Sequence, residues 1–212
     1  MDKKIIINIG RQLGAGGQEI GRMLAGDFNA KYYDRELLNL AAKESGFSEE
    51  FFKHNDERKG FLRSFLNLPF GNGVSSTNFY QNKFSQESLF KFQSDAIRKA
   101  AQESSCVFLG RCADYVLRDF PNVVNIFITA SLDFRINIVC QSKGISETEA
   151  RKLIEFKEKN RADYYSYYTG KQWGMASSYD FCIDASLLGL DATEKIIAGF
   201  VRQRFDIPDE NH

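Results

Sequence analysis

The segment IIINIGRQLGAGGQEIGRMLA, residues 5–25, decides the fold. Its apolar start predicts a buried strand, its glycines predict a tight loop, and the spacing of Ile20, Met23 and Leu24 predicts an amphipathic helix. A loop of small residues between a strand and a helix leaves backbone N–H groups free to converge on a phosphate, which the helix N-terminus also favours. We therefore expect a phosphate-binding loop, formed by Gly14, Ala15, Gly16, Gly17, Gln18 and Glu19.

The loop departs from the P-loop pattern G-x-x-x-x-G-K-[ST], although Gly16 fits its second glycine. Arg11 takes the place of the first glycine, Gly17 that of the lysine, and Gln18 that of the serine or threonine. The guanidinium of Arg11, at the start of the loop, is the natural replacement for the missing lysine charge. The segment thus predicts a phosphate loop whose positive charge has moved.

Two other interpretations of the loop remain open at this point. Gly14-Ala15-Gly16 begins the dinucleotide pattern G-x-G-x-x-G, and Asp34 lies twenty residues after Gly14, where such folds carry an acid. The sixth place of that pattern is Glu19, however, and four residues separate the strand from Gly14. On this interpretation the chain is a nicotinamide-dependent oxidoreductase. The remaining interpretation is a glycine-rich turn without a ligand.

Composition restricts the class of protein. At 212 residues, 43% of them hydrophobic, the chain has enough apolar side chains for the core of one domain. Its 28 basic and 28 acidic residues balance, so we expect no nucleic-acid partner, and any anion site must be local. The apolar runs are too short to span a membrane. The scattered Cys106, Cys112, Cys140 and Cys182 are typical of reduced thiols, so we expect a cytoplasmic protein.

Strand-like and helical patterns alternate along the chain. Strand-like runs cover residues 3–9, 106–109, 123–128 and 181–183, with a short one at 31–33. Helical patterns cover residues 17–28, 36–43, 86–102, 132–141, 147–158 and 192–205. Ser146 with Glu149, and Asp191 with Glu194, have the spacing of a capping box at a helix start. This alternation predicts a parallel sheet covered by helices on both faces.

Residues 59–83 break the alternation, because their many phenylalanines, Pro69 and the Gly71-Asn72-Gly73 turn follow no sustained period. A connection of this length predicts a flap or lobe. Its aromatic residues equally suit a contact with a second copy, which makes a homodimer possible.

Three stretches together resemble the cytidylate kinase-like family, a branch of the P-loop nucleoside monophosphate kinases. They are the opening loop, KYYDRELL at residues 31–38 and VFLGRCADYVL at residues 107–117. The resemblance continues through FITASLDFRI at 127–136, the stretch at 144–174 and YDFCIDAS at 179–186. It implies a single three-layer P-loop domain over residues 1–212, with a central parallel sheet of about five strands in the order 2-3-1-4-5. An inserted helical acceptor-binding region is expected at about 36–104 and a lid at about 144–174.

The resemblance also implies roles for particular residues. Asp34, Arg35, Arg111 and Asp114 match the positions that bind the acceptor nucleotide. Arginine suits an acceptor phosphate because its planar fork makes two parallel hydrogen bonds. The lid is expected to supply cations that neutralise the transferred phosphoryl group, from Arg135, Lys157 and Arg161, alongside Arg11.

The expected activity is ATP-dependent phosphoryl transfer to a nucleoside monophosphate, with CMP or dCMP as the first candidate. The alternative is a nucleotide-binding regulatory protein without turnover, favoured by the missing lysine and by Leu109, where related kinases carry an acid before the glycine. These departures predict no metal held by protein groups. Mg²⁺ is expected to be held by the nucleotide phosphates and water, consistent with its tendency to keep several waters. Small-molecule nucleotides are the expected partners.

Overall fold

The computed structural model describes residues 4–35 and 76–208, without the side chains of residues 76–85. Within these ranges the chain forms a parallel sheet of five strands, in the order β2-β3-β1-β4-β5. The strands are β1 (Ile6–Arg11), β2 (Lys31–Tyr33), β3 (Cys106–Leu109), β4 (Val123–Thr129) and β5 (Phe181–Asp184). The predicted strand order is confirmed. The dinucleotide-binding interpretation is wrong, because such folds place β2 next to β1, whereas here β3 separates them.

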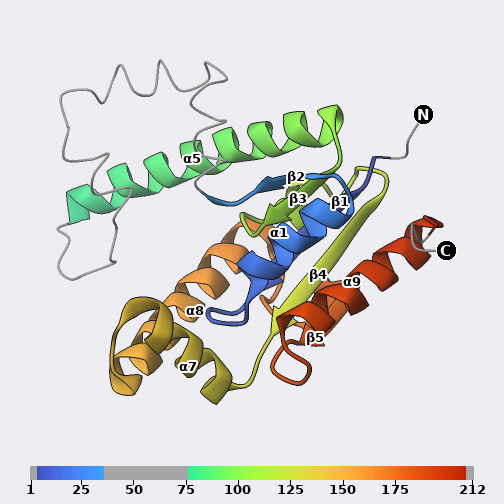
Figure 1. Ribbon diagram of the computed structural model, residues 1–212. Coiled ribbons are helices and arrows are strands. Elements are labelled where there is room, and N and C mark those ends of the chain that lie inside the picture. The colour runs from blue at the N-terminus through green and yellow to red at the C-terminus, as the bar shows by residue number, and fades with distance from the viewer. Residues whose placement is uncertain (1–3, 36–75, 209–212) are drawn as a thin grey trace.

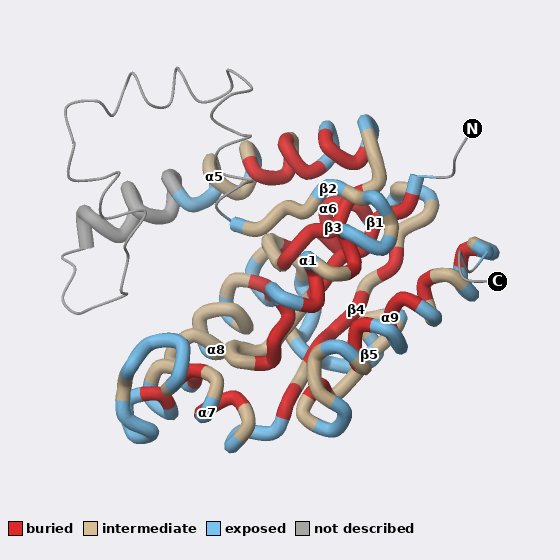
Figure 2. Tube along the Cα trace, viewed as in Figure 1, coloured by how far each residue is buried: buried red, intermediate tan, exposed pale blue. Residues whose placement is uncertain are grey.

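Helices cover both faces of the sheet, so the predicted three layers are confirmed (Figure 1). On one face lie α1 (Gly17–Asp27) and α9 (Leu190–Phe205), whose apolar side chains pack on Ile7 and Ile9 of β1. On the other face α5 (Ser76–Glu103) and the short α6 (Ala113–Val116) pack on Ile6 and Phe108. Successive residues of a strand point to opposite faces, so the run Ile5-Ile6-Ile7 supplies both sides of the core. Figure 2 shows the central strands as buried along most of their length.

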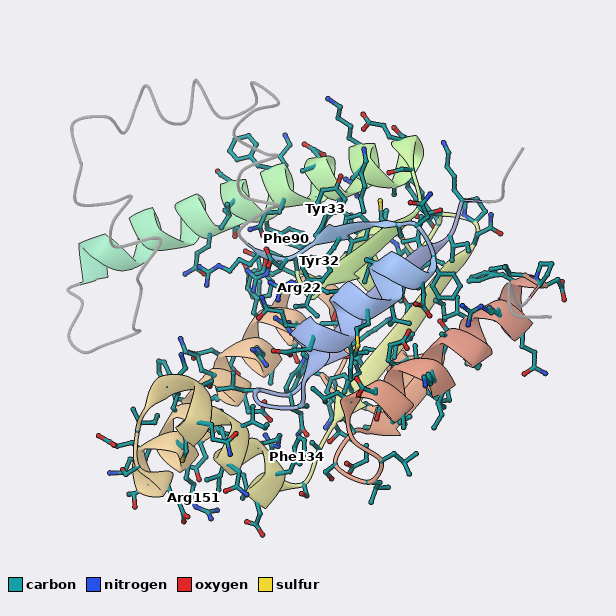
Figure 3. The ribbon with its side chains drawn as sticks, viewed as in Figure 1. Arg22, Tyr32, Tyr33, Phe90, Phe134 and Arg151 are labelled. Atoms are coloured by element: carbon teal, nitrogen blue, oxygen red, sulfur yellow. The ribbon has the colours of Figure 1, made fainter. Side chains whose placement is uncertain are left out.

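The two tyrosines of β2 illustrate the same alternation. Tyr32 lies on the α1 side, where the Arg22 guanidinium is 5.5 Å from its ring centroid. Tyr33 lies on the α5 side, stacked on Phe108 with ring centroids 5.3 Å apart, and Phe90 of α5 joins the same apolar cluster (Figure 3). A three-residue edge strand is thus held from both faces.

A pair of helices, α7 (Leu132–Lys143) and α8 (Glu147–Thr169), follows β4 and lies at the end of the sheet where the glycine loop is found (Figure 1). Ile136, Val139, Ala150 and Ile154 form a small apolar cluster between them, separate from the two clusters on the sheet. Ser146 and Glu149 make the predicted capping box at the start of α8. A 3₁₀ turn, η1 (Ala176–Ser178), then leads into β5.

Several element boundaries differ from the sequence prediction. Helix α8 continues to Thr169 rather than 158, and Gly170, with φ of 69°, ends it. Helix α5 begins at Ser76, so residues 76–83 are helical rather than irregular. The prediction of an Asp191 cap is wrong, because α9 begins at Leu190 with Gly189 as its N-cap. The predicted helix at 36–43 and residues 59–75 lie outside the described residues. Within the described part, no helix is long and apolar enough to cross a membrane.

Candidate active site

The glycine loop joins β1 to α1 at the carboxyl end of the sheet. Gly14 and Gly16 have φ of 80° and 74°, in the left-handed region that glycine adopts without steric cost. Gly16 is the N-cap of α1 and offers no side chain to its first turn, so backbone N–H groups there remain available to an anion. The local geometry therefore leaves the N-terminus of α1 open to an anion.

Neighbouring elements fix the loop before its glycines. The Leu13 N–H donates to Oε1 of Glu158 on α8 at 2.8 Å. The Gln12 side chain reaches the end of β4, where its Oε1 accepts from the Thr129 hydroxyl and from the Ala130 N–H. The loop is therefore tied to both α8 and the sheet.

Arg11 and Gly17 share one space. A Cβ atom built on Gly17 would lie 2.7 Å from Cγ of Arg11 and 2.8 Å from its Cβ, so the arginine stem covers the position from which a P-loop lysine would project. The guanidinium extends to the end of β3, where its Nη1 lies 2.6 Å from the position that a Cβ on Gly110 would take. Arg11 thus brings a positive charge to the loop from the end of β1, and points it toward β3.

Left-handed backbone turns the chain sharply at the end of β3. Gly110, Arg111 and Cys112 have φ of 75°, 60° and 55°. Residues other than glycine rarely adopt this backbone region. Such local strain is common at functional sites, where the position of a side chain matters. Here it places the Arg111 guanidinium 4.6 Å from the centroid of the Tyr164 ring.

Arg11, Arg111 and Arg161 form an arginine cluster at this edge. Arg161 donates from Nη1 to the backbone oxygen of Arg11 at 3.0 Å. Burial, together with the charges of Arg161 and Arg111, lowers the pKa of Arg11 to about 9, while Tyr32 and Asp34 oppose that effect. Burial also lowers the pKa of Arg161. Positive charge concentrated in this way favours a bound anion.

A cavity open to solvent adjoins the cluster. Its walls come from the ends of β1 and β3, from α8 and from the segment before β5. They comprise Asn8, Ile9, Gly10, Arg11, Gly110, Arg111, Cys112, Ala113, Asp114, Arg161, Tyr164, Tyr165, Trp173 and Tyr179. A wall that combines three arginines with aromatic and polar side chains suits a small molecule that carries an anionic group.

Asp114 and Tyr165 form a buried pair in the wall of this cavity. The Tyr165 hydroxyl donates to Oδ2 of Asp114 at 2.7 Å, and both residues are buried. Burial raises the pKa of the Asp114 carboxyl, which the hydrogen bond from Tyr165 partly offsets. Burial and the adjacent carboxylate raise the pKa of Tyr165 as well, so this tyrosine stays a donor. The hydrogen bond from Tyr165 fixes the orientation of the Asp114 carboxyl within the cavity wall.

The predicted site residues divide into two groups. Arg11, Arg111, Asp114 and Arg161 are brought together around the cavity. Arg135 is buried elsewhere: its Nε donates to the Ala130 oxygen, and its Nη1 lies 3.1 Å from Oε2 of Glu158. A partner carboxylate therefore already neutralises that cation.

The other predicted residues lie outside the cavity wall. Lys157 lies with Nζ 5.7 Å from the Phe156 ring centroid. Asp34 and Arg35 are close enough to the site for their charges to act on it. Asp34 raises the pKa of Arg11, and Arg35 acts to lower the pKa of Tyr164. In the loop, Gln18 and Glu19 are exposed, whereas Gly14 is half-buried and Ala15, Gly16 and Gly17 are buried.

Sequence reasoning missed part of the site. Asn8, a polar residue within the apolar run of β1, was visible as an exception in that run. Tyr164, Tyr165 and Trp173 stood out as an aromatic stretch, but nothing in the sequence placed them opposite β1 and β3. Glu158 carried no signal, because one acidic residue on a charged helix is indistinguishable from a solvated one.

The donor groups present do not fit a protein-held magnesium ion. Gln18 and Leu109 stand where related loops supply a hydroxyl and an acid. Across residues 4–35 and 76–208, no group of three His, Cys, Asp or Glu side chains lies close enough together to hold a metal.

Sheet order, glycine loop and covering helices together define a P-loop kinase-like fold. The chain belongs to the cytidylate kinase-like family, whose model matches residues 6–187. None of the curated proteins matches the chain significantly.

Solved structures share the fold. An uncharacterized protein from Eubacterium ventriosum is 27% identical, covers 95% of this chain and 100% of its own, and has a TM-score of 0.73. A shikimate kinase from Bacteroides thetaiotaomicron is 12% identical over 93% of this chain and 98% of its own, with a TM-score of 0.52. A shikimate kinase from Acinetobacter baumannii, in complex with shikimate, is 10% identical over 96% of both chains, also with a TM-score of 0.52. The two kinases show the likeness of fold alone.

Proposed function

We propose that the protein transfers the γ-phosphoryl group of ATP to a nucleoside monophosphate, with CMP or dCMP as the first candidate. ATP enters with Mg²⁺ already held by its phosphates and water. The glycine loop from Gly14 to Glu19 holds the donor phosphates, and the cavity holds the acceptor. Lys157, Asp34 and Arg35 remain proposed contributors at the rim. Possible pairing of two copies stays a prediction.

The arginine cluster is the observation that carries this proposal. Arg11 connects the two halves of the site, because its stem lies on Gly17 at the start of α1 and its head lies at Gly110. Phosphoryl transfer depends mainly on alignment of two phosphates and on neutralisation of their charge. The three arginines lie between the loop and the cavity, where they suit that task. One phosphate, at the loop or in the cavity, would neutralise only part of their charge, so the cluster favours two phosphates bound together.

A nucleotide-binding regulator without turnover is the second candidate. The glycine at position 17 and Leu109 at the end of β3 favour it, because both remove groups that related kinases use. Such a protein would bind triphosphate at the loop but would have no acceptor to align.

A coupled assay with ATP and Mg²⁺ separates the two candidates. The acceptor panel contains CMP, dCMP, UMP, AMP and GMP, and also shikimate because of the structural neighbours. We expect transfer to a pyrimidine monophosphate. The Arg111→Lys variant keeps the charge and loses the planar fork, so its kcat/KM for the acceptor should fall about tenfold to a hundredfold, as expected for loss of a charge-assisted hydrogen bond. ATP affinity should be unchanged.

Arg118→Lys is the matched control. Its guanidinium also lies over a tyrosine ring, 4.3 Å from the centroid of Tyr115, but it lies outside the cavity wall. This variant should keep full activity. ATP binding without transfer to any acceptor would favour the regulator. Transfer to shikimate alone would show that the acceptor is not a nucleotide.

A further inference from the structure

A polar side chain lies in the middle of the central strand, among apolar neighbours. Asn8 of β1 shares a sheet face with Ile6, which packs under α5, and it borders the cavity toward the carboxyl end of the strand. The residue is 4% exposed. A buried amide in such a position must have its polar groups satisfied, or it costs free energy.

One end of this amide is satisfied. Nδ2 of Asn8 donates to Oδ1 of Asn125 on β4 at 2.9 Å. Oδ1 of Asn8 is the other end of the amide and takes no part in that bond. Among the described residues, this oxygen is buried and has no hydrogen-bond partner.

The cavity wall holds a second buried polar atom of the same kind. The Tyr164 hydroxyl also lacks a hydrogen-bond partner among the described residues, and burial raises the pKa of that tyrosine. Tyr164 lies against Arg111, whereas Asn8 lies on the strand beneath the cavity. Two unsatisfied atoms in the walls of one cavity point to a ligand that supplies their partners.

We propose that Asn8 is a specificity-determining residue for the acceptor, and that its Oδ1 accepts a hydrogen bond from an N–H or O–H group of that molecule. This inference rests on the proposed function. The arginine cluster binds the acceptor phosphate, and Asn8 discriminates at the neutral end. In a nucleoside monophosphate the donor is either the exocyclic amino group of the base or a sugar hydroxyl. A ligand that lacks the donor leaves the oxygen buried and unpaired, so it binds more weakly.

Calorimetric titration of the wild-type protein tests this with two ligand pairs. CMP and UMP differ in the base amino group, and CMP and dCMP differ in the 2′-hydroxyl. We expect CMP to bind about tenfold more tightly than one of its two partners, which corresponds to about 1.4 kcal/mol. The pair that discriminates identifies the donor. Equal binding of all three ligands overturns the inference without any variant.

Two leucine substitutions locate the effect. Asn8→Leu should bind the discriminating pair with equal affinity. Asn125→Leu removes the same interstrand hydrogen bond but leaves Asn8 itself in the cavity wall, so it should keep the preference. Equal loss of preference in both variants, or equal weakening of both ligands in Asn8→Leu, overturns the role of Asn8. Failure of the wild-type protein to bind any nucleoside monophosphate overturns the proposed function instead, and this inference with it.

Discussion

At the residue scale, positions 11 and 17 are linked by packing, because the stem of Arg11 lies against Gly17. A lysine at position 17 and an arginine at position 11 cannot coexist in this backbone, because the Arg11 stem occupies the space where a Cβ at 17 would lie. Position 17 must therefore be glycine for the Arg11 side chain to take this conformation. The consequence is that the cation lies nearer β3 than a lysine on α1 would.

Arg11→Met should separate the steric role of Arg11 from its charge. Methionine keeps an apolar stem over Gly17 and removes the guanidinium, whose charged form is disfavoured by burial and by two neighbouring arginines. The melting temperature of the ligand-free protein should therefore rise. ATP and inorganic pyrophosphate should bind more weakly, by about 1.5–3 kcal/mol for one lost charge-assisted contact.

Thermal melting with and without pyrophosphate measures both effects. Arg151→Met, at an exposed position on α8, is the control and should change neither quantity. A lower melting temperature with unchanged pyrophosphate affinity would mean that Arg11 only supports the loop.

Gly16 does not offer an equally clean test of the phosphate cradle. A Cβ there would lie 2.2 Å from Cδ2 of Leu190 on α9, and the residue has φ of 74°. A β-branched substitution would therefore disturb the backbone and the α1–α9 packing as well as any bound phosphate.

At the element scale, α8 holds the first half of the glycine loop. Glu158 and Arg161 lie three residues apart, on one face of the helix. Glu158 accepts from the Leu13 N–H, and Arg161 donates to the Arg11 oxygen. The helix expected to act as a lid is thus bonded to the donor loop in this conformation, and loop geometry depends on where α8 lies.

Glu158→Ala should lower both stability and phosphate affinity. It removes the Leu13 anchor and leaves Arg135 without its partner, in a pair whose side chains are only 17% and 10% exposed. Loss of one partner from a buried pair costs on the order of 3–5 kcal/mol, toward the lower end here because some exposure remains. Urea unfolding and ATP titration measure the two effects.

A double variant distinguishes them. Arg135→Met with Glu158→Leu removes both charges, so it should recover most of the lost stability. ATP affinity should stay low, because the Leu13 N–H still lacks its acceptor. Recovery of ATP affinity together with stability would show that Glu158 has no specific role in positioning the loop.

At the scale of the whole molecule, the contact between α1 and α9 joins the beginning and the end of the described chain. Glu194 of α9 is buried there, beside Asp27 at the end of α1. Arg202 lies 3.5 Å from the Asp27 carboxylate, and Lys195 is a further cation near Glu194. Burial and the Asp27 charge raise the pKa of Glu194 to about 7, so the protonated acid is the form that the fold favours.

Folding stability should therefore fall as pH rises from about 4.5 to 7 because of this group. An acid whose pKa is raised in the folded state contributes its stability below its unfolded pKa, and that contribution is lost as pH passes the folded value. Glu194→Gln should put a neutral side chain of nearly the same shape beside Asp27 and remove the titration. Its free energy of unfolding should exceed that of wild type at pH 8 and approach it near pH 5.

Urea unfolding at several pH values measures this difference. Glu155→Gln, at an exposed position on α8, is the matched control and should follow the wild-type pH profile. A Glu194→Gln protein that is less stable than wild type at pH 8 would show that the ionised carboxylate, paired with a cation, is the native form.

Much of the architecture could be predicted because its signals are local. The apolar run before the loop, the glycines and the amphipathic α1 pattern each depend on neighbouring residues, and the family resemblance supplied the strand order. The capping box at Ser146 was found because both its residues lie within one turn. The same spacing failed at Asp191, where the φ of Gly189 and the packing of Leu190 over Gly16 set the helix start.

The sequence by itself determined the layered parallel sheet and the position of the glycine loop with Arg11 at its start, because strand periodicity and small loop residues act over short distances. The candidates Arg111, Asp114 and Arg161 came from the family resemblance. Only the tertiary structure decided how these groups combine. It placed the Arg11 stem over Gly17, paired Arg135 with Glu158, and brought the α8 tyrosines and Asn8 into the walls of one cavity. Each of these contacts joins residues on different elements, so each depends on packing that no local pattern encodes.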